Sequence, residues 1–420
     1  MDNDINLVEQ LGINSIKINN IEHSCKYYDT LDFKTKIDGC KEKFSVLSLN
    51  IRSLHSKIND LKELILEDAC NTNFNFSVVI LQEVWNIKNI NTLGIDGYHP
   101  IVEKGRERRQ GGGLGMFIRE GFKYETLHEF SQIGDVFESL VIKIFTNQSK
   151  FKIIVNLYRI PNTRIESFIE GINNLLLALK PLNSEEIILA GDFNINLIKF
   201  NDHDLTNDFL NTLISHSFLP LLTMSTRITQ TSATLIDNIF SNRQTNSFES
   251  GLIYSSISDH LPVFYLGVEI QNANVKIDVK KRNMSKTNID LFKQKLLQND
   301  WLPILNDFNP ENAFSKFSTE IEKNFEKCFP FKDFKQDKRK TPLNEWMNRD
   351  LLELRKNKEK LFKCKIKNRT LESKNKFIES SRIYKAAVRD AKRNYYSNKF
   401  NEYSKDMKKT WETINTLIKR

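Results

Sequence analysis

The sequence predicts an α/β protein in which layered sheets are covered by helices and which continues into a basic α-helical extension. From Phe44 to about residue 270, short apolar strands alternate with amphipathic helical segments, a pattern that favours sheets packed between helices. All 15 glycines lie at or before Gly267, and no proline follows Pro342. Residues 343–420 therefore contain no strong helix breaker and are rich in Lys, Glu, Asn and Leu, which predicts long helices.

These changes in pattern divide the chain into segments. Residues 1–43 lack clear periodicity and are predicted to be a poorly ordered leader. Residues 44–270 are predicted to form the α/β domain. Residues 271–342 are predicted to bridge this domain to the helical extension at 343–420.

The elements of the α/β domain are predicted in chain order from local patterns. Short apolar runs predict strands, and apolar residues repeated every three or four positions predict helices. The helix that begins at Ile165 is ended by Pro181. The predicted elements are strand 44–49, helix 54–69, strands 78–81, 114–118, 140–145 and 153–158, helix 165–179, strand 187–190, helix 204–215, and strands 235–240 and 263–268.

Charge is distributed unevenly along the chain. Residues 341–420 contain 22 Lys and Arg against 10 Asp and Glu, whereas residues 1–340 contain 40 against 43. A near-neutral body with a basic appendage fits a polyanionic partner, of which nucleic acid is the most common. A solvated helical face held by salt bridges is the alternative explanation.

Composition argues against several classes of protein. The apolar content of 40% is ordinary for a globular protein. The N-terminal segment is polar and acidic and no apolar run is long enough to span a bilayer, so we expect neither a signal peptide nor a membrane partner. The five cysteines are odd in number and never two residues apart, which favours neither a disulfide framework nor a zinc site and indicates a reducing, intracellular location.

Polar residues stand at the ends of two predicted strands. Asn50 ends the first strand, and Glu83 follows the strand at 78–81. A hard divalent ion such as Mg²⁺ takes oxygen ligands and uses one or two carboxylates, leaving positions for water and phosphate. Glu83 and Asn50 are therefore candidate ligands of Mg²⁺, with Mn²⁺ as an alternative. Each residue taken alone is also explained as a solvent-facing polar group.

A carboxylate and a carboxamide follow the buried strand at 187–190. Asp192 and Asn194 are two residues apart, so their side chains can project from the same side of the strand. Such an Asp can orient an attacking water and accept its proton, and the Asn can donate to a phosphate oxygen.

An imidazole precedes the last predicted strand, in Ser258-Asp259-His260. His260 can stabilise a pentacovalent transition state or protonate a leaving oxygen, provided that a carboxylate fixes its tautomer. Asp237 is the candidate for that carboxylate.

Two further segments are candidate contacts for phosphate. Tyr158 and Arg159 end a strand with a phenol and a guanidinium, although Arg159 is equally well explained as a surface cation. Arg108 and Arg109 precede the glycines at 111–113, and this segment is explained either as a backbone contact or as a mobile turn. It lacks the lysine-serine ending and the following helix of a P-loop, which excludes nucleotide binding of that kind.

Together these segments resemble the endonuclease/exonuclease/phosphatase superfamily, and within it the apurinic-like endonuclease domain of non-LTR (LINE-type) retrotransposons. The resemblance covers roughly residues 44–270. Its blocks, all in the family's order, are Leu49–Leu54, Leu81–Glu83, Gly111–Gly115, Tyr158–Asn162, Gly191–Asn194, Ile236-Asp237 and Ser258–His260. The resemblance implies a four-layer α/β sandwich, with two packed mixed sheets flanked by helices, that hydrolyses phosphodiesters with Mg²⁺.

The resemblance also implies a role for each candidate residue. Arg52 stands where abasic-site repair enzymes typically have an Asp, and retroelement endonucleases resemble this chain there, so DNA nicking is favoured over repair. The implied roles are metal binding by Asn50 and Glu83, activation of water by Asp192 with Asn194 beside it, pairing of His260 with Asp237, support from Asp259, phosphate contact by Tyr158, and DNA contact by Arg52, Arg159, Arg108 and Arg109.

The leading hypothesis is therefore a nuclear, Mg²⁺-dependent DNA endonuclease that nicks one strand by attack of a metal-activated water. One alternative is a phosphatase or phospholipase of the same superfamily. The other is a degenerate remnant that binds nucleic acid without cutting it.

The extension resembles the segment that joins such endonucleases to a reverse transcriptase, so RNA or a reverse transcriptase is a further candidate partner. No paired-aspartate polymerase motif precedes Arg420, and the chain resembles a truncated or domesticated retroelement product.

Overall fold

The chain is described by a computed structural model. It describes residues 25–37, 40, 43–67, 74–85, 93–103, 111–147, 150–243, 248–269, 279–334, 345–404 and 406–418. The chain divides into a larger unit, 1–274 with 341–420, and a smaller unit, 275–340. Across the described ranges, no helix is both long enough and apolar enough to cross a membrane.

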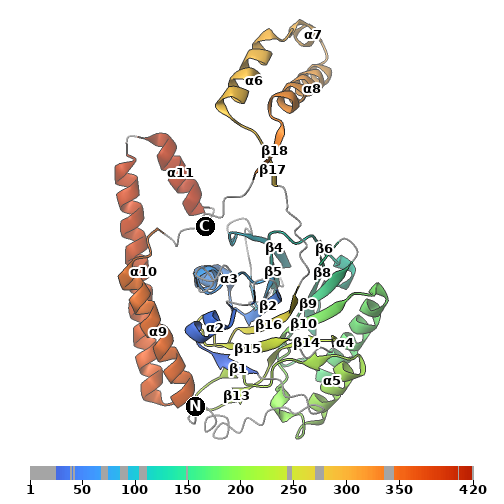
Figure 1. Cartoon of the computed structure of the whole chain (residues 1–420), viewed down its shortest axis with the longest axis vertical. Coiled ribbons are helices and arrows are strands. Elements are labelled where there is room, and N and C mark those ends of the chain that lie inside the picture. The colour runs from blue at the N-terminus through green and yellow to red at the C-terminus, as the bar shows by residue number, and fades with distance from the viewer. Residues whose placement is uncertain are drawn as a thin grey trace. The chain divides into compact units, whose positions relative to one another are not determined.

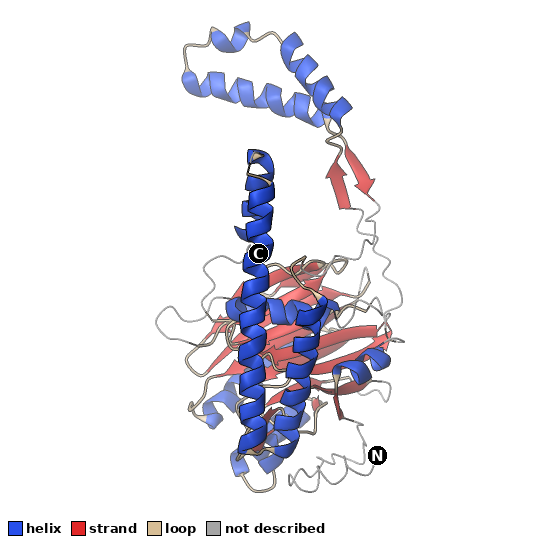
Figure 2. Cartoon of the chain, turned by 90° about the vertical axis from the view of Figure 1, so that its left-hand side faces the viewer, coloured by secondary structure: helices blue, strands red, loops and turns tan. Residues whose placement is uncertain are grey.

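Two large mixed sheets, called sheet A and sheet B here, lie at the centre of the larger unit's described part (Figures 1 and 2). Sheet A has the strand order β1 (Lys26–Tyr28), β15 (Glu249–Ile253), β16 (Val263–Glu269), β2 (Lys43–Asn50), β3 (Val78–Gln82), β5 (Leu114–Arg119) and β4 (Tyr98–Glu103). Sheet B has the order β11 (Leu219–Pro220), β14 (Asp237–Ser241), β10 (Glu186–Asp192), β9 (Phe151–Arg159), β8 (Phe137–Phe145) and β6 (Tyr124–Thr126), and β7 (Gln132–Ile133) also pairs with β8. A separate hairpin is formed by β12 (Arg227–Ile228) and β13 (Ala233–Thr234).

Helices cover the outer face of each sheet (Figure 1). Sheet A is covered by α2 (Thr30–Ile37), α3 (Leu54–Lys62) and its π-helical continuation η1 (Glu63–Glu67). Sheet B is covered by α4 (Ile165–Leu179) and α5 (Asp204–Ser215). Short 3₁₀ turns are η3 (His128–Phe130), η4 (Lys180–Leu182) and η5 (Leu197–Lys199). The predicted four-layer α/β sandwich is confirmed.

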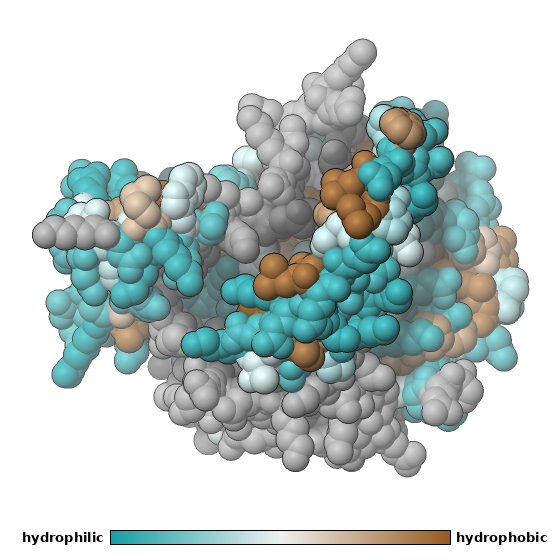
Figure 3. Space-filling model, turned by 90° about the horizontal axis from the view of Figure 1, so that it is seen from above, coloured by the Kyte–Doolittle hydropathy of each residue, from teal (hydrophilic) through white to brown (hydrophobic). Residues whose placement is uncertain are grey.

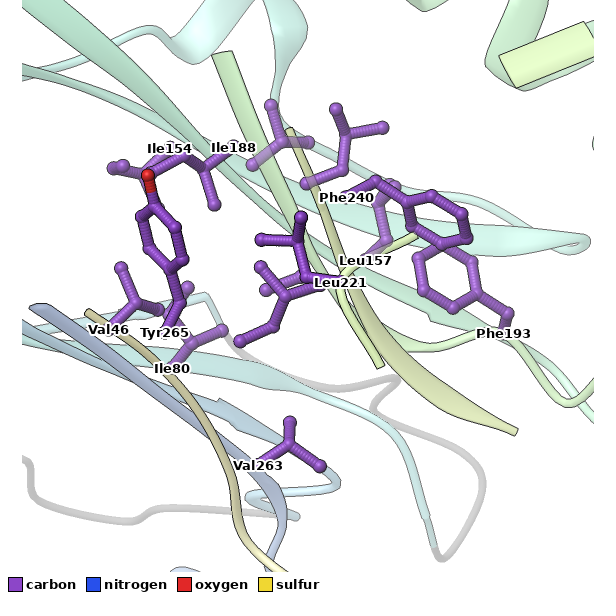
Figure 4. Close-up of a cluster of buried hydrophobic side chains, with 14 of the residues drawn as sticks. Val46, Ile80, Ile154, Leu157, Ile188, Phe193, Leu221, Phe240, Val263 and Tyr265 are labelled. Carbon is purple, nitrogen blue, oxygen red and sulfur yellow. The ribbon is translucent and has the colours of Figure 1, made fainter. Parts of the chain in front are cut away.

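The main core lies between the facing sides of the two sheets. Successive side chains of a strand point to opposite faces, so each buried strand supplies one set of side chains to this core and another to its outer helices. Figure 4 shows side chains that meet there, among them Val46, Ile80, Val263 and Tyr265 from sheet A and Ile154 and Ile188 from sheet B, while Leu157 and Phe240 lie on the opposite face of sheet B, near Phe193. Each such side chain contributes about 1.5–3 kcal/mol on burial, which holds the strand ends in fixed positions.

Part of the predicted leader has a defined structure. Strand β1 pairs in parallel with β15, with Lys26 opposite Gly251. Phe33 and Ile37 of α2 are buried in the cluster that covers sheet A. A three-residue strand is too short to show a repeating pattern, which explains why periodicity did not reveal it.

The C-terminal region is helical, as predicted, and consists of α9 (Arg349–Asn368), α10 (Leu371–Glu402) and α11 (Met407–Ile418). Asn348 and Thr370 cap the first two helices by accepting backbone N–H groups. The two helices lie side by side (Figure 2), joined at Arg369, which has the left-handed φ of 55° that ends many helices. Phe362 and Ile366 of α9 belong to the main hydrophobic cluster, so this part of the basic extension packs on the sandwich.

The smaller unit falls within the predicted bridging region. Its hairpin of β17 (Val279–Arg282) and β18 (Phe331–Phe334) carries α6 (Lys286–Gln298), α7 (Leu302–Leu305) and α8 (Pro310–Cys328). Phe292, Phe325 and Phe329 form an aromatic cluster inside it. This unit also exposes large apolar side chains, among them Leu297 in α6 and Phe308 between α7 and α8. Figure 3 shows apolar patches on the largely hydrophilic surface of the described residues.

Candidate active site

The ends of strands from both sheets bring the predicted catalytic residues together. In sheet A, β2 and β3 run parallel, so Asn50 lies opposite Gln82 and next to Glu83. In sheet B, β10 lies between β9 and β14, and Asp192 lies opposite Tyr158 on one side and Asp237 on the other. The three strands are buried along nearly their whole length, and the polar side chains stand where each strand ends.

Gly191 is required where β10 approaches β9. A Cβ atom at this position would lie 1.9 Å from the carbonyl oxygen of Leu157, which belongs to the neighbouring backbone. The glycine of the Gly-Asp-Phe-Asn motif therefore allows the close strand pairing that places Asp192 at the site.

Asn50 connects the two sheets at the site. Its Nδ2 donates hydrogen bonds of 2.8 Å both to Glu83 Oε1 and to Asp192 Oδ2. Tyr158 donates from its hydroxyl to the same Glu83 oxygen at 3.2 Å. Burial, followed by the negative charge of Glu83, raises the pKa of Tyr158 well above its usual value, so the phenol stays protonated and can donate.

The backbone around Glu83 is held in an unusual conformation. Glu83 has a φ of 52°, in the left-handed region that residues other than glycine rarely adopt. The carbonyl oxygens of Gly112 and Gly113 accept from the two residues that follow, at 3.0 and 3.1 Å. Both glycines have positive φ, which explains why glycine is present there. The glycine run thus supports the segment after β3. Arg108 and Arg109, which precede this run, lie outside the described residues.

The donor atoms at Asn50 and Glu83 fit a hard divalent cation. Asn50 Oδ1 is buried and has no hydrogen-bond partner within the described parts of the chain. The Glu83 carboxylate lies beside it, held by the amide of the same Asn50 side chain. A carboxylate and an unpaired amide oxygen are the ligands that Mg²⁺ prefers.

Asp192 is buried at the centre of the site, with 1% of its surface exposed. It accepts hydrogen bonds from Asn50 Nδ2 and, at 3.0 Å, from the backbone N–H of Asn194. Burial and then the neighbouring Asp237 charge raise the pKa of Asp192 to about 7, against the lowering effect of His260 and Asn50. A carboxyl group with such a pKa is suited to accept a proton near neutral pH.

His260 and Asp237 form a buried pair. The Nδ1 of His260 lies 3.0 and 2.9 Å from the two carboxylate oxygens of Asp237, and Thr226 donates to Asp237 Oδ2 at 2.6 Å. Burial lowers the pKa of His260, but Asp237 and the more distant Asp192 and Asp259 outweigh burial and raise it to about 9. His260 is therefore cationic at neutral pH, and its Nε2 points away from Asp237.

Asp192, Asp237 and His260 also form a compact group of potential metal ligands, with one atom of each within 4.8 Å of the others. The hydrogen bond between His260 and Asp237 uses Nδ1 as a donor, which suits a proton-holding pair. Within the described residues, the better fit for a metal is thus the unpaired oxygen of Asn50 with Glu83.

Asp259 lies at the rim of the site and binds two arginines. Its Oδ2 accepts from Arg52 Nη1 at 2.8 Å and from Arg227 Nε at 3.0 Å. Burial raises the pKa of Asp259, but the charges of His260, Arg52 and Arg227 outweigh it and lower the pKa. Arg52 also approaches Glu83, with 3.9 Å between Nε and Oε2, and is 42% exposed, so it is available to a ligand.

Asn194 and Arg159 differ from their predicted roles. The side-chain amide of Asn194 donates to the carbonyl oxygen of Arg159 at 2.7 Å, so it is used within the protein, and only its backbone N–H contacts Asp192. Arg159 was predicted to contact DNA, but it is 4% exposed and its guanidinium donates to the carbonyl oxygens of Asn194 and Thr163. Arg159 therefore joins two loops beneath the site, because the backbone that follows β9 folds over it.

The structure adds residues that the sequence analysis did not select. Thr226 holds Asp237, Arg227 holds Asp259, and Glu359 of α9 binds Ser256 in the segment before His260. Thr226 and Arg227 lie in a short hairpin with no motif of their own. Glu359 is 103 positions from its partner, so no local pattern in the sequence links the two.

Solved structures with similar folds have low sequence identity to the chain. The endonuclease domain of TRAS1, a telomere-specific non-LTR retrotransposon, is 14% identical with a TM-score of 0.42, covering 55% of this chain and 100% of that one. The AP endonuclease LMAP from Leishmania major is 14% identical with a TM-score of 0.45, covering 54% and 88%. The catalytic domain of Xenopus laevis APE2 is 17% identical with a TM-score of 0.41, covering 55% and 94%. No curated protein matches the chain.

A family model gives the clearest relationship. The model described as the Endonuclease/Exonuclease/phosphatase family matches residues 47–260, just over half of the chain. The matched range begins within β2 and ends at His260, so it contains the strand ends described above. The predicted family is confirmed: the chain belongs to the Endonuclease/Exonuclease/phosphatase family.

Proposed function

We propose that the chain is a divalent-metal-dependent DNA endonuclease that nicks one strand, of the kind found in non-LTR retrotransposons. Its family consists of hydrolases that act on phosphodiesters or phosphate esters. The observation that carries the proposal is the arrangement around Asn50, which holds Glu83 and Asp192 together while leaving its own Oδ1 unpaired. Carboxylates and an unpaired amide oxygen beside a cationic imidazole are the groups needed to hydrolyse a phosphate ester.

In this proposal Glu83 and Asn50 Oδ1 hold a divalent ion, which when bound supplies positive charge to a phosphate oxygen. Asp192 accepts the proton of the attacking water, and the Asn50 amide and the Asn194 N–H fix the orientation of its carboxylate. Mg²⁺ is the expected ion, with Mn²⁺ as an alternative.

His260 and Tyr158 act on the phosphate. The cationic His260, held by Asp237, stabilises charge on the phosphate or gives its proton to the leaving oxygen. Tyr158, kept protonated by its surroundings, donates a hydrogen bond to a phosphate oxygen. Both groups are fixed by the fold before substrate binds, which lowers the reorganisation that the reaction requires.

The choice of DNA is supported by the charge at the rim. Arg52 and Arg227 lie on the solvent side of the site, and Arg52 is partly exposed. Guanidinium groups suit the repeated phosphates of a nucleic-acid backbone. A location in the nucleus follows from a DNA substrate and is part of the same proposal.

The test is the conversion of supercoiled plasmid to nicked circle in Mg²⁺ and in EDTA, run beside p-nitrophenyl phosphate and a soluble inositol phosphate. Metal-dependent nicking with little release of phosphate from the small esters supports the endonuclease. Preferential hydrolysis of a small ester contradicts it and favours a phosphatase of the same family. A folded protein that hydrolyses neither substrate contradicts the assignment of catalysis and favours a binding remnant.

A further inference from the structure

The α9–α10 helix pair lies outside the matched family range and contacts the site from one side. Glu359 of α9 accepts hydrogen bonds from the backbone N–H of Ser256 at 3.0 Å and from its hydroxyl at 2.6 Å. Ser256 is four residues before His260 in the same loop. The carboxylate of Glu359 thus fixes the segment that delivers the catalytic imidazole.

The junction of α9 and α10 contacts a second element of the site. Arg369 Nε donates to the carbonyl oxygen of Thr229 at 3.0 Å, and Lys374 Nζ donates to Gln230 Oε1 at 3.4 Å. Thr229 and Gln230 form the tip of the β12–β13 hairpin. The first strand of this hairpin forms a backbone bridge to His260 through Arg227, so the helix junction is connected to the catalytic loop by one short hairpin.

This junction presents positive charge next to the rim of the site. Lys365 is half-buried, with its Nζ 5.3 Å from the Phe362 ring and 5.1 Å from the Phe377 ring. Burial outweighs the negative charge of Asp259 and, together with the positive charge of Lys374, lowers the pKa of Lys365. The charges of Asp259 and Lys374 thus act on Lys365 in opposite directions.

Several cations share the rim carboxylate of Asp259. The carboxylate of Asp259 already binds Arg52 and Arg227. Lys365 interacts with Asp259 as well, and Arg369 and Lys374 add two positive charges at the tip of the hairpin that begins at Arg227, where their contacts are to neutral oxygen atoms. Like charges held together by a fold repel one another, and an anion bound between them relieves that repulsion.

We infer that Lys365, Arg369 and Lys374, called the junction cations here, bind the phosphate backbone of the nucleic-acid substrate beside the catalytic loop. This inference rests on the proposed endonuclease function and extends its binding surface beyond the family range. It also assigns the basic helices a position: they form one side of the substrate site. The hydrophobic packing of Phe362 and Ile366 in the main core fixes that position.

The test compares DNA binding by a variant that lacks these charges with binding by the wild type. Lys365→Gln, Arg369→Gln and Lys374→Gln are combined, and the Kd for a duplex oligonucleotide is measured in EDTA by fluorescence polarisation over a range of salt concentrations. Each phosphate contact contributes about 0.9 to the slope of log Kd against log salt. We expect weaker binding and a slope smaller by about 3 in the variant, or by about 1 for each contact that is lost.

A matched control removes the same charge from another part of α10. Lys376, Arg382 and Arg393 are exposed and are paired with Glu372, Glu379 and Asp390 of the same helix. Their combined change to Gln is expected to leave the salt slope close to that of the wild type. An equal decrease in both variants would overturn the inference, because it would report net charge alone.

The outcomes also separate this inference from the proposed function. If the wild type nicks plasmid and the junction variant binds DNA with the wild-type Kd and slope, the inference is wrong while the endonuclease stands. If the wild type neither nicks nor binds, both fail. Thermal unfolding checks that the variant is folded. If it is not, Lys374→Glu alone is measured, and it must weaken DNA binding for the inference to hold.

Discussion

Asn50 and Asp192 lie 142 positions apart in the chain and are joined by a hydrogen bond of 2.8 Å between Asn50 Nδ2 and Asp192 Oδ2. Asn50 ends a strand of sheet A and Asp192 ends a strand of sheet B. The bond therefore connects the two layers of the sandwich at the site. The rigid core between the sheets determines how far apart these two side chains are, and the proposed chemistry depends on that separation.

The metal site can be tested by changing one proposed ligand. Glu83→Gln keeps the shape of the side chain and removes its charge, so we expect the affinity for Mg²⁺ to fall by about tenfold or more. Isothermal titration calorimetry measures this affinity directly. Glu129→Gln, an exposed position on the turn η3, is the matched control and should bind Mg²⁺ as the wild type does. Equal affinity in the Glu83 variant would place the metal elsewhere.

The pH dependence of nicking should report His260. Its pKa is raised to about 9 by the charge of Asp237 against the effect of burial. The cationic form is the active one in the proposal, so nicking should decline as the pH rises through about 9. Asp237→Asn removes the charge that favours the cation, and the alkaline decline should then move to lower pH by about one to three units. A decline at the same pH in both proteins would show that another group titrates there.

The raised pKa of His260 should also make the free energy of unfolding depend on pH. His260 has a higher pKa in the folded protein than its usual value of 6.5, so the folded state holds its proton more tightly than the unfolded state. This contribution to the free energy of unfolding is fully present below pH 6.5 and is lost as the pH rises through about 9. In Asp237→Asn the contribution should be largely absent, which urea unfolding at pH 6 and pH 10 measures.

A buried ion pair within sheet B should be more sensitive to mutation than an exposed pair. Lys152 and Glu186 are almost fully buried and bind each other, and Glu186 also accepts from Ser241 at 2.6 Å and Tyr265 at 2.8 Å. Lys152→Met leaves the carboxylate without its cation, and we expect the free energy of unfolding to fall by about 3–5 kcal/mol. Urea unfolding checks this value.

The control for that prediction is an exposed pair. Lys376 and Glu372 are one turn apart on α10, and both side chains are largely exposed. Lys376→Met should change the free energy of unfolding by less than about 1 kcal/mol. If the free energy of unfolding fell by the same small amount in both variants, the prediction for the Lys152–Glu186 pair would be wrong.

The sequence allowed much of the fold and the centre of the site to be predicted. Strands that are buried on both faces consist of nearly continuous apolar residues. The ends of these strands, at Asn50, Glu83 and Asp192, could therefore be located from the sequence. The order of the motifs then indicated the family, which fixed how these ends meet. The pairing of His260 with Asp237 follows from that order, and the structure brings the two side chains into contact.

The features that were not predicted depend on how deeply a side chain is buried and on contacts between distant positions in the chain. Arg159 looks like a surface cation in the sequence, because a local pattern does not reveal that later loops cover it. Strand β1 was hidden by its short length. The contact of Glu359 with Ser256 joins segments 103 positions apart, and the sequence of α9 alone gives only its basic, helical character.

The most direct test of the central claim is metal-dependent plasmid nicking by wild type, Asp192→Asn and Asp208→Asn. Asp208 is exposed on α5, so its change matches the chemistry of the first without altering the site. The account predicts that the wild type and Asp208→Asn nick DNA at similar rates, while Asp192→Asn loses nicking by a factor of about 100 or more and keeps nearly the same DNA affinity. Full nicking by folded Asp192→Asn would contradict the account.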